Sequence, residues 1–366
     1  MKKWLLSLCM VLALVACKDE KKESAQADVK PVIKIGVSLP LTGDLAFMGN
    51  IAKEAVLMGF EKWKKQDTKY QYQLVIEDDG FEPKKIATAG NKLINYDHVN
   101  AVISFFDQPA YYYFNQATEK KFIHMTCSWG DDLSDGTYNF NNITSHAEAA
   151  QKLVGYMKKI GIKRIGYVSQ NNRGPMHLKD NMMRELAKAG IEVAYEETFN
   201  IGNKDYRMFL ASVEDKPVDV IMAVFLLPDL FAFAKQKSEM GIQTPLTTVD
   251  YFEDTDNKEI FNNYFYVVAS KGNDDFQKAI MERTGSDAKA CVANTYDNLD
   301  LLIWAYENAE SEAGKIPTAQ SVSKVLRQVK DRDGSVGKIN VMDNGHIESA
   351  AHMKKIVNGQ PIEISE

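Results

Sequence analysis

The segment that decides the fold reads Val32-Ile33-Lys34-Ile35-Gly36-Val37-Ser38-Leu39-Pro40-Leu41-Thr42-Gly43. Residues 32–38 are rich in β-branched and apolar side chains and predict a buried strand, and Pro40 and Gly43 predict a loop directly after it. Apolar residues then recur at helical spacing, which predicts a helix over residues 50–65. A strand, a loop and a helix in this order form the repeating unit of a parallel α/β sheet.

This alternation continues along the chain in two sets. In the first set we expect further strands at 72–77, 101–105 and 122–126, and helices at 83–96 and 110–120. The second set predicts helices at 147–160, 175–189, 205–213 and 228–240, with strands at 164–169, 192–197, 218–224, 245–249 and 264–269. Two helical segments, 288–309 and 318–329, precede a strand-like tail at 338–357. The predicted fold class is α/β, with two doubly wound Rossmann-like lobes.

Length and charge limit the partners. A chain of 366 residues exceeds the size at which a single core stops growing, which also favours two lobes. Acidic and basic residues are interspersed and sum to a net charge of -6, so no nucleic-acid partner is expected. We expect a monomer that binds a small molecule. In parallel sheets such ligands bind beyond the carboxyl ends of strands, here the loops after Ser38, Phe105, Thr126, Ser169, Phe225 and Val249.

Neither a disulfide framework nor a metal site is expected. Cys127 and Cys291 could pair in an oxidising compartment, but they lie far apart in the sequence, and buried free thiols are the favoured interpretation. Asp78 and Asp79 have no histidine or further carboxylate nearby at ligand spacing, so a helix-capping loop before Pro83 is favoured. No cofactor is expected.

The N-terminus predicts export and membrane attachment. Residues 4–16 form an apolar run of about 13 residues after two lysines, too short for a membrane span and typical of a signal peptide. Leu14 to Cys17 resembles the lipobox of bacterial lipoproteins, which implies that Cys17 is acylated and becomes the N-terminus. Residues 1–16 are then the lipoprotein signal peptide, and 17–30 are polar enough to form a flexible tether. The expected location is the periplasm or the outer face of the cytoplasmic membrane.

Five motifs, in order along the mature chain, carry a family resemblance. They lie at residues 33–43, at 76–85 (Ile-Glu-Asp-Asp-Gly-Phe-Glu-Pro-Lys-Lys), at 203–206 (Asn-Lys-Asp-Tyr), at 293–297 (Ala-Asn-Thr-Tyr-Asp) and at 336–345 (Val-Gly-Lys-Ile leading to Asp-Asn-Gly). Together they resemble the type I periplasmic solute-binding proteins, specifically the branched-chain amino-acid-binding (Leu/Ile/Val-binding-like) family of ABC importers. The resemblance implies a non-enzymatic protein that binds a solute between two lobes and delivers it to an ABC permease.

The resemblance also implies how the lobes are joined. The chain would cross between them three times, near Thr144, Ser270 and Val336. The first lobe would contain residues 31–144 and 271–335, and the second 145–270 and 336–366.

In this family an acid of the second lobe holds the ligand's ammonium, and small or hydroxyl residues of the first lobe clamp its carboxylate. Asp250, at the end of the strand 245–249, stands where the family places the acid, although a helix-capping role stays open. The first lobe departs from the pattern, because Trp129 stands close to the usual threonine donor and only Ser128 remains. We expect Ser128, Trp129 and Asp250 to bind ligand. Weaker candidates are Phe106, Gln108, Arg173 and Leu226.

The expected solute is small and organic: amino-acid-like, an amide or aromatic. The departures favour a flatter or amine-bearing solute over leucine or valine. Phe105, Phe106 and Trp129 either form an aromatic binding wall or pack in the core, and the sequence leaves both interpretations open. No phosphate loop, His-Glu-x-x-His or Gly-x-Ser-x-Gly motif occurs, so no catalytic residues are expected. A sensor that presents its closed form to a membrane receptor remains an alternative to transport.

Overall fold

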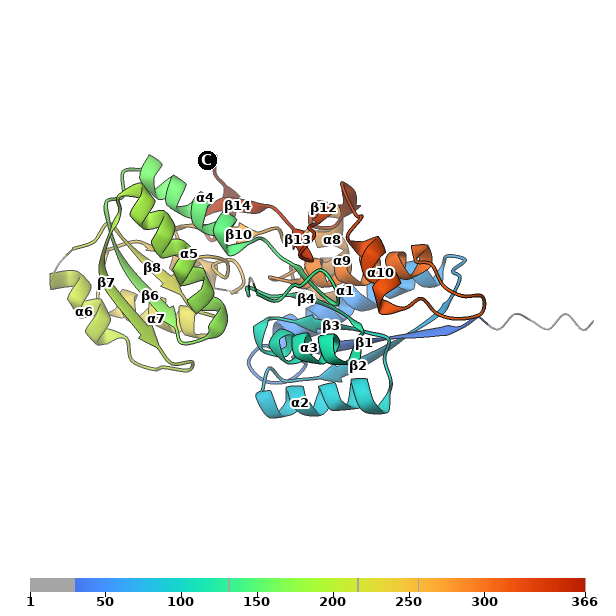
Figure 1. Ribbon diagram of the computed structural model, residues 1–366. Coiled ribbons are helices and arrows are strands. Elements are labelled where there is room, and N and C mark those ends of the chain that lie inside the picture. Colours follow the sequence, from blue (N-terminus) through green and yellow to red (C-terminus); the bar gives the residue numbers. More distant parts are fainter. Residues whose placement is uncertain (1–29, 131, 216, 256, 366) are drawn as a thin grey trace, which may run out of the picture.

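The computed structural model describes residues 30–130, 132–215, 217–255 and 257–365. The expected signal peptide, Cys17 and all of the tether except Lys30 lie outside these residues. The described chain forms two α/β lobes that lie side by side (Figure 1), which confirms the predicted fold class.

The first lobe is built on an eight-stranded sheet in the order β11-β12-β13-β5-β4-β3-β1-β2. The run from β13 to β2 is parallel, whereas β11 and β12 are added antiparallel. The strands are β1 (Val32–Leu39), β2 (Gln71–Asp78), β3 (Ala101–Phe105), β4 (Ile123–Cys127), β5 (Asn139–Asn142), β11 (Arg332–Gly334), β12 (Gly337–Val341) and β13 (His346–Glu348).

Helices cover both faces of this sheet. This is seen at β3, where side chains of neighbouring residues point to opposite faces and belong to different apolar clusters. Ile103 packs in the cluster that contains residues of α1 and α9, and Val102 packs in the cluster that contains residues of η1 and α3. The helices are α1 (Ala46–Lys64), α2 (Pro83–Asn91) with the π-helix η1 (Lys92–Tyr96), α3 (Asp107–Lys120), α8 (Asp274–Thr284), α9 (Val292–Asn308) and α10 (Ala319–Leu326).

The second lobe combines a parallel and an antiparallel sheet. The parallel order is β7-β6-β8-β9, and a single bridge between Val249 and Val267 joins it to the antiparallel order β10-β14-β15. The strands are β6 (Arg164–Gln170), β7 (Glu192–Phe199), β8 (Val220–Val224), β9 (Leu246–Thr247), β10 (Phe265–Ala269), β14 (Ala351–Val357) and β15 (Gln360–Glu363). The helices are α4 (His146–Lys159), α5 (Arg173–Ala189), α6 (Arg207–Asp215), α7 (Asp229–Glu239) and the 3₁₀ helix η2 (Lys258–Phe261).

The C-terminal segment differs from the prediction. We expected one strand-like tail at 338–357 that belongs to the second lobe, but the segment is shared between the two sheets. A turn at Gly345 reverses the chain, and β13 then lies parallel to β5, with Ile347 opposite Asn142. Strands β12 and β13 therefore belong to the first sheet, and only β14 and β15 belong to the second. The predicted boundary at 336 is therefore too early by these two strands.

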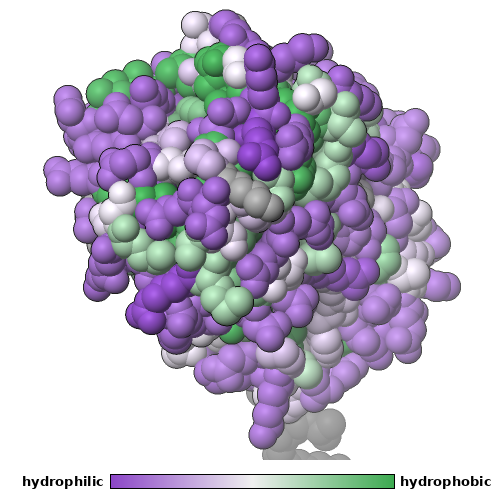
Figure 2. All heavy atoms as spheres, turned by 90° about the vertical axis from the view of Figure 1, so that its left-hand side faces the viewer, coloured by the Kyte–Doolittle hydropathy of each residue, from purple (hydrophilic) through white to green (hydrophobic). Residues whose placement is uncertain are grey.

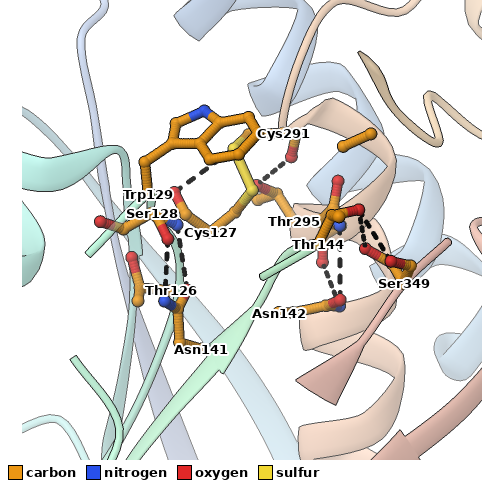
Figure 3. The surroundings of a disulfide bond; sticks show 12 residues. Thr126, Cys127, Ser128, Trp129, Asn141, Asn142, Thr144, Cys291, Thr295 and Ser349 are labelled. Carbon is orange, nitrogen blue, oxygen red and sulfur yellow. Dashed lines mark hydrogen bonds between the residues drawn. A yellow bond between two sulfur atoms is a disulfide. The ribbon is translucent and has the colours of Figure 1, made fainter. Parts of the chain in front are cut away.

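Three short segments of chain cross between the lobes, and the third is hydrogen-bonded to each of the other two. Thr144 lies between β5 and α4, and its hydroxyl donates to the carbonyl of Ser349, between β13 and β14, over 2.7 Å (Figure 3). The N–H of Ser270, after β10, donates to the carbonyl of Ala350 over 3.2 Å. The third crossing therefore lies at Ser349, whereas the sequence had placed it near Val336. Three adjacent crossings form a hinge of the kind that lets two lobes close on a ligand.

Hydrophilic side chains cover most of the outer face of the second lobe (Figure 2). Across the described residues, every helix is too short or too polar to span a bilayer.

Candidate functional site

A disulfide lies at the carboxyl end of the first sheet (Figure 3). It joins Cys127, the last residue of β4, to Cys291, just before α9, with a Cα–Cα distance of 5.6 Å. The favoured interpretation of two free thiols was therefore wrong. Sequence separation is no obstacle, because α9 packs against β3 and β4 and brings the two cysteines to the same edge. The bond ties the loop after β4 to α9.

That loop is held by Asp107, the first residue of α3. One oxygen of its carboxylate, Oδ1, accepts hydrogen bonds from the Ser128 hydroxyl and from the Trp129 N–H, the latter over 2.9 Å. Asn141 of β5 fixes the same loop by accepting from the Ser128 N–H and donating to the Ser128 carbonyl (Figure 3). Burial raises the pKa of Asp107, while the bonds from Ser128 and Trp129 oppose that rise.

Aromatic and amide side chains flank Asp107. Phe106 has a φ of 65° and packs on Phe105 and Phe81, with ring centroids 4.1 Å and 6.3 Å away. Gln108 lies in the first turn of α3. Its side-chain oxygen, Oε1, is buried and accepts no hydrogen bond from any described residue.

The second lobe contributes Asp250 and Tyr251. Asp250 follows the bridge at Val249, and its Oδ1 accepts from the Ala269 N–H over 2.9 Å. Its Oδ2 is buried and has no hydrogen-bond partner among the described residues. Burial raises the pKa of Asp250 to about 8. Burial also raises the pKa of Tyr251, and the charges of Asp250 and Asp107 add to this rise.

The two lobes meet beside these acids. A Cβ atom on Gly174, in the first turn of α5, would lie 2.1 Å from Oδ2 of Asp107 and 3.5 Å from Cβ of Trp129. The Trp129 ring stacks on His146, the first residue of α4, with centroids 5.2 Å apart. The polar and aromatic groups of both lobes therefore form one interface.

An ion pair closes the rim of this interface. The guanidinium of Arg173, at the start of α5, bonds Asp132 of the first lobe over 2.9 Å. It also lies 3.8 Å from the centroid of the Tyr111 ring, within the range of a cation–π contact.

A cavity of 330 Å³ lies between the lobes, a volume in the range of small-molecule sites. Gln108 lines it from the first lobe and Leu226 from the second. Gln170 and Asp229 line it too, and their side chains are joined by a 2.7 Å hydrogen bond from Nε2 of Gln170 to Oδ2 of Asp229. Oε1 of Gln170 accepts from the Leu226 N–H, which fixes the amide.

A second recess of 670 Å³ shares Leu227 and Pro228 with this cavity. Charged residues of both signs line it, including Glu54 and Arg283, which bond each other.

The structure does not bring all the predicted site residues together. Ser128 and Trp129 are held by Asp107, Asp250 lies in the second lobe with Oδ1 bonded to the Ala269 N–H, and Gln108 and Leu226 line the 330 Å³ cavity. Phe106 is buried in an aromatic cluster, and Arg173 is bonded at the rim.

Sequence reasoning did not single out several residues that the structure places at the interface. They are Asp107, Gly174, Tyr251, Gln170 and Asp229. Asp107 carried a usable signal, because it lies two residues after the expected strand 101–105 and opens the next helix. No cluster of three or more potential metal-ligating side chains occurs in the described parts of the chain.

Comparison with known proteins decides the family. The family model described as "periplasmic binding protein" matches residues 32–360. The chain belongs to the periplasmic binding protein family. This confirms the resemblance inferred from the motifs, and the matched proteins of this family are binding proteins rather than enzymes.

A curated relative in Pseudomonas aeruginosa is a leucine-, isoleucine-, valine-, threonine- and alanine-binding protein. It is 25% identical over 253 residues, a match that spans 66% of this periplasmic binding protein and 66% of the relative.

Solved structures share the fold. A branched-chain amino-acid transporter substrate-binding protein from Streptococcus pneumoniae, in complex with isoleucine, gives a TM-score of 0.79 at 18% identity, covering 91% of this chain and 100% of that one. A leucine-binding protein from Thermotoga maritima gives 0.82 at 19%, covering 91% and 98%. A solute-binding protein of an ABC transporter from Rhodopseudomonas palustris, in complex with 3,4-dihydroxybenzoic acid, gives 0.79 at 16%, covering 91% and 96%.

Proposed function

We propose that this periplasmic binding protein captures a small organic solute between its lobes and delivers it to an ABC permease. The observation that carries the proposal is the 330 Å³ cavity that residues of both lobes line. Gln108 of the first lobe and Asp250 of the second each keep a buried acceptor oxygen that no described residue fills. Such groups are costly to bury, and a ligand with N–H donors would satisfy them.

The hinge supplies the motion that this function needs. A ligand shifts the lobes toward closure only if it binds the closed form better than the open one. Gln108 of the first lobe and Gln170 and Leu226 of the second line one cavity and provide that difference, because a ligand contacts all three only when the lobes approach.

We further propose that the mature protein is a lipoprotein tethered through Cys17. The sequence supports this through the short apolar run and the polar segment after it. Replacing the anchor tests the proposal directly, because Cys17→Ala should release the protein from membranes. A Cys17→Ala variant that still sediments with membranes after a salt wash would contradict the anchor.

Identifying the solute that the purified protein retains is the most direct test of binding. Mature protein starting at Lys18 is purified without denaturation, then denatured, and the released small molecules are identified by mass spectrometry. A stoichiometric solute that rebinds the emptied protein is the expected result. If transport is the role, deletion of the protein abolishes uptake of that solute. Unchanged uptake with a lost cellular response would instead identify a sensor.

A further inference from the structure

We propose that Asp107 makes the cleft selective for an organic cation that carries N–H donors and no carboxylate. This inference rests on the proposed function, because it concerns the ligand class of the same site. The inference is based on Asp107, whose carboxylate already accepts the hydrogen bonds that the loop after β4 could otherwise donate to a ligand carboxylate.

The donors of the loop after β4 are engaged. The Ser128 hydroxyl and the Trp129 N–H both donate to Oδ1 of Asp107, and the Ser128 N–H donates to Asn141. A carboxylate ligand here would have to displace Asp107, which would then be buried without its bonds. Leaving a buried carboxylate unsatisfied is strongly unfavourable.

The cationic side chain at the rim is also engaged. Arg173 bonds Asp132 at the rim and lies against the Tyr111 ring, so its guanidinium has partners already. Binding a ligand carboxylate would require it to give up the pair with Asp132.

Two acceptor oxygens, in contrast, are still able to accept hydrogen bonds from a ligand. Oδ2 of Asp250 and Oε1 of Gln108 are buried and receive no hydrogen bond from the described residues. Asp107 and Asp250 are both nearly inaccessible to water, at 5% and 1% exposed. An organic cation would supply the charge and the N–H groups that these oxygens lack.

The charges around the cavity that Gln108 lines also favour a cation. Three carboxylates and one lysine line this 330 Å³ cavity: Asp44, Glu82, Asp229 and Lys204. Trp129 and Tyr251 add aromatic surface, which attracts cations through the ring face. His146 and His177 are the titratable bases that face Asp107.

Matched probes separate the two ligand classes. The first set is 3-methylbutylamine, leucine and 4-methylpentanoate. The amine is leucine without its carboxylate and the acid is leucine without its amino group, so all three carry the same branched apolar end. The second set is benzylamine and benzoate. Calorimetric titration of emptied wild-type protein should show each amine binding at least about tenfold more tightly than its carboxylate partner, a difference of about 1.4 kcal/mol.

Asp107→Asn tests the residue itself. The asparagine keeps an acceptor for Ser128 and Trp129 but removes the charge, so amine binding should weaken by about tenfold or more. Asp67→Asn is the matched control, because that carboxylate is 99% exposed and its loss changes the net charge equally. A thermal melt of both variants checks folding, and the wild-type probe comparison does not depend on either variant.

The outcomes distinguish this inference from the proposed function. Leucine or benzoate that binds wild type as tightly as the matched amine, and closes the lobes, overturns the role of Asp107 and leaves the binding function intact. If neither class binds and no solute co-purifies, both are overturned. An equal loss of amine affinity in Asp67→Asn and Asp107→Asn also overturns the assignment, since it would reflect net charge alone.

Discussion

Gly174 of the second lobe lies directly against the carboxylate of Asp107 in the first. A Cβ at Gly174 would lie 2.1 Å from Oδ2 of Asp107, far inside van der Waals contact. Every side chain other than that of glycine would therefore collide with the opposite lobe when the lobes are in this arrangement. This contact makes the closure of the lobes directly testable.

Gly174→Ala should hold the lobes apart. We expect a larger radius of gyration in the presence of ligand and an affinity weakened by about tenfold or more, because the closed form becomes less populated. Folding should persist, since alanine favours a helix by about 1 kcal/mol over glycine. Gly155→Ala is the matched control, because a Cβ on this α4 residue meets nothing within 4 Å. Equal scattering profiles for both variants with ligand would contradict the contact.

Cation binding should release a proton from Asp250. Burial raises the pKa of its carboxyl to about 8, so at neutral pH the folded protein holds this proton while the unfolded chain has lost it. A raised acid pKa favours the folded state at low pH, and this contribution is lost as the pH rises toward 8. A cationic ligand favours the ionised form, so its affinity should rise between pH 6 and 8, by up to about tenfold per unit.

Titration calorimetry in two buffers of different ionisation enthalpy measures that proton. The groups that also influence Asp250 are Lys271, Asp254 and Glu253, and Asp250→Asn removes the titrating group without changing them. The variant should lose the proton release and the steep pH dependence. Identical proton release in wild type and Asp250→Asn would refute the assignment.

The Cys127–Cys291 bond should stabilise the first lobe. Removing a native disulfide of this kind typically lowers the free energy of unfolding by about 2–4 kcal/mol. Urea titration of wild type with and without reductant measures this loss. The double variant Cys127→Ala, Cys291→Ala serves as the control, because reductant should leave its unfolding curve unchanged. Two free thiols in the oxidised native protein, detected by alkylation and mass spectrometry, would show that the bond does not form.

Periodicity predicted the elements that carry an apolar face. The parallel strands such as β1 and β6 and the helices such as α1 and α5 follow from it. Strand β5 was not predicted, because three of its four residues are asparagines. Their side chains are buried in hydrogen bonds with groups far away in sequence, which no local pattern reveals. Helix α8 was not predicted either.

The same limit applies to the site. Ser128, Trp129 and Asp250 were predicted to bind ligand because the family resemblance places ligand contacts there and because strand ends are where ligands bind. Asp107 follows a strand too, but its importance comes from its bonds to Ser128 and Trp129, which are 21 and 22 positions away, and from Gly174 in the other lobe. The disulfide was missed for the same reason, since its two cysteines are 164 positions apart. Contacts of this kind depend on the tertiary fold and not on local sequence.

Solution scattering of the mature protein, with and without the solute that co-purifies with it, tests the central claim that the ligand binds between the lobes. We predict that saturating solute decreases the radius of gyration, and that Gly174→Ala reduces this decrease while Gly155→Ala does not. A scattering profile that does not change at saturating solute, with binding verified by calorimetry on the same sample, would contradict the account.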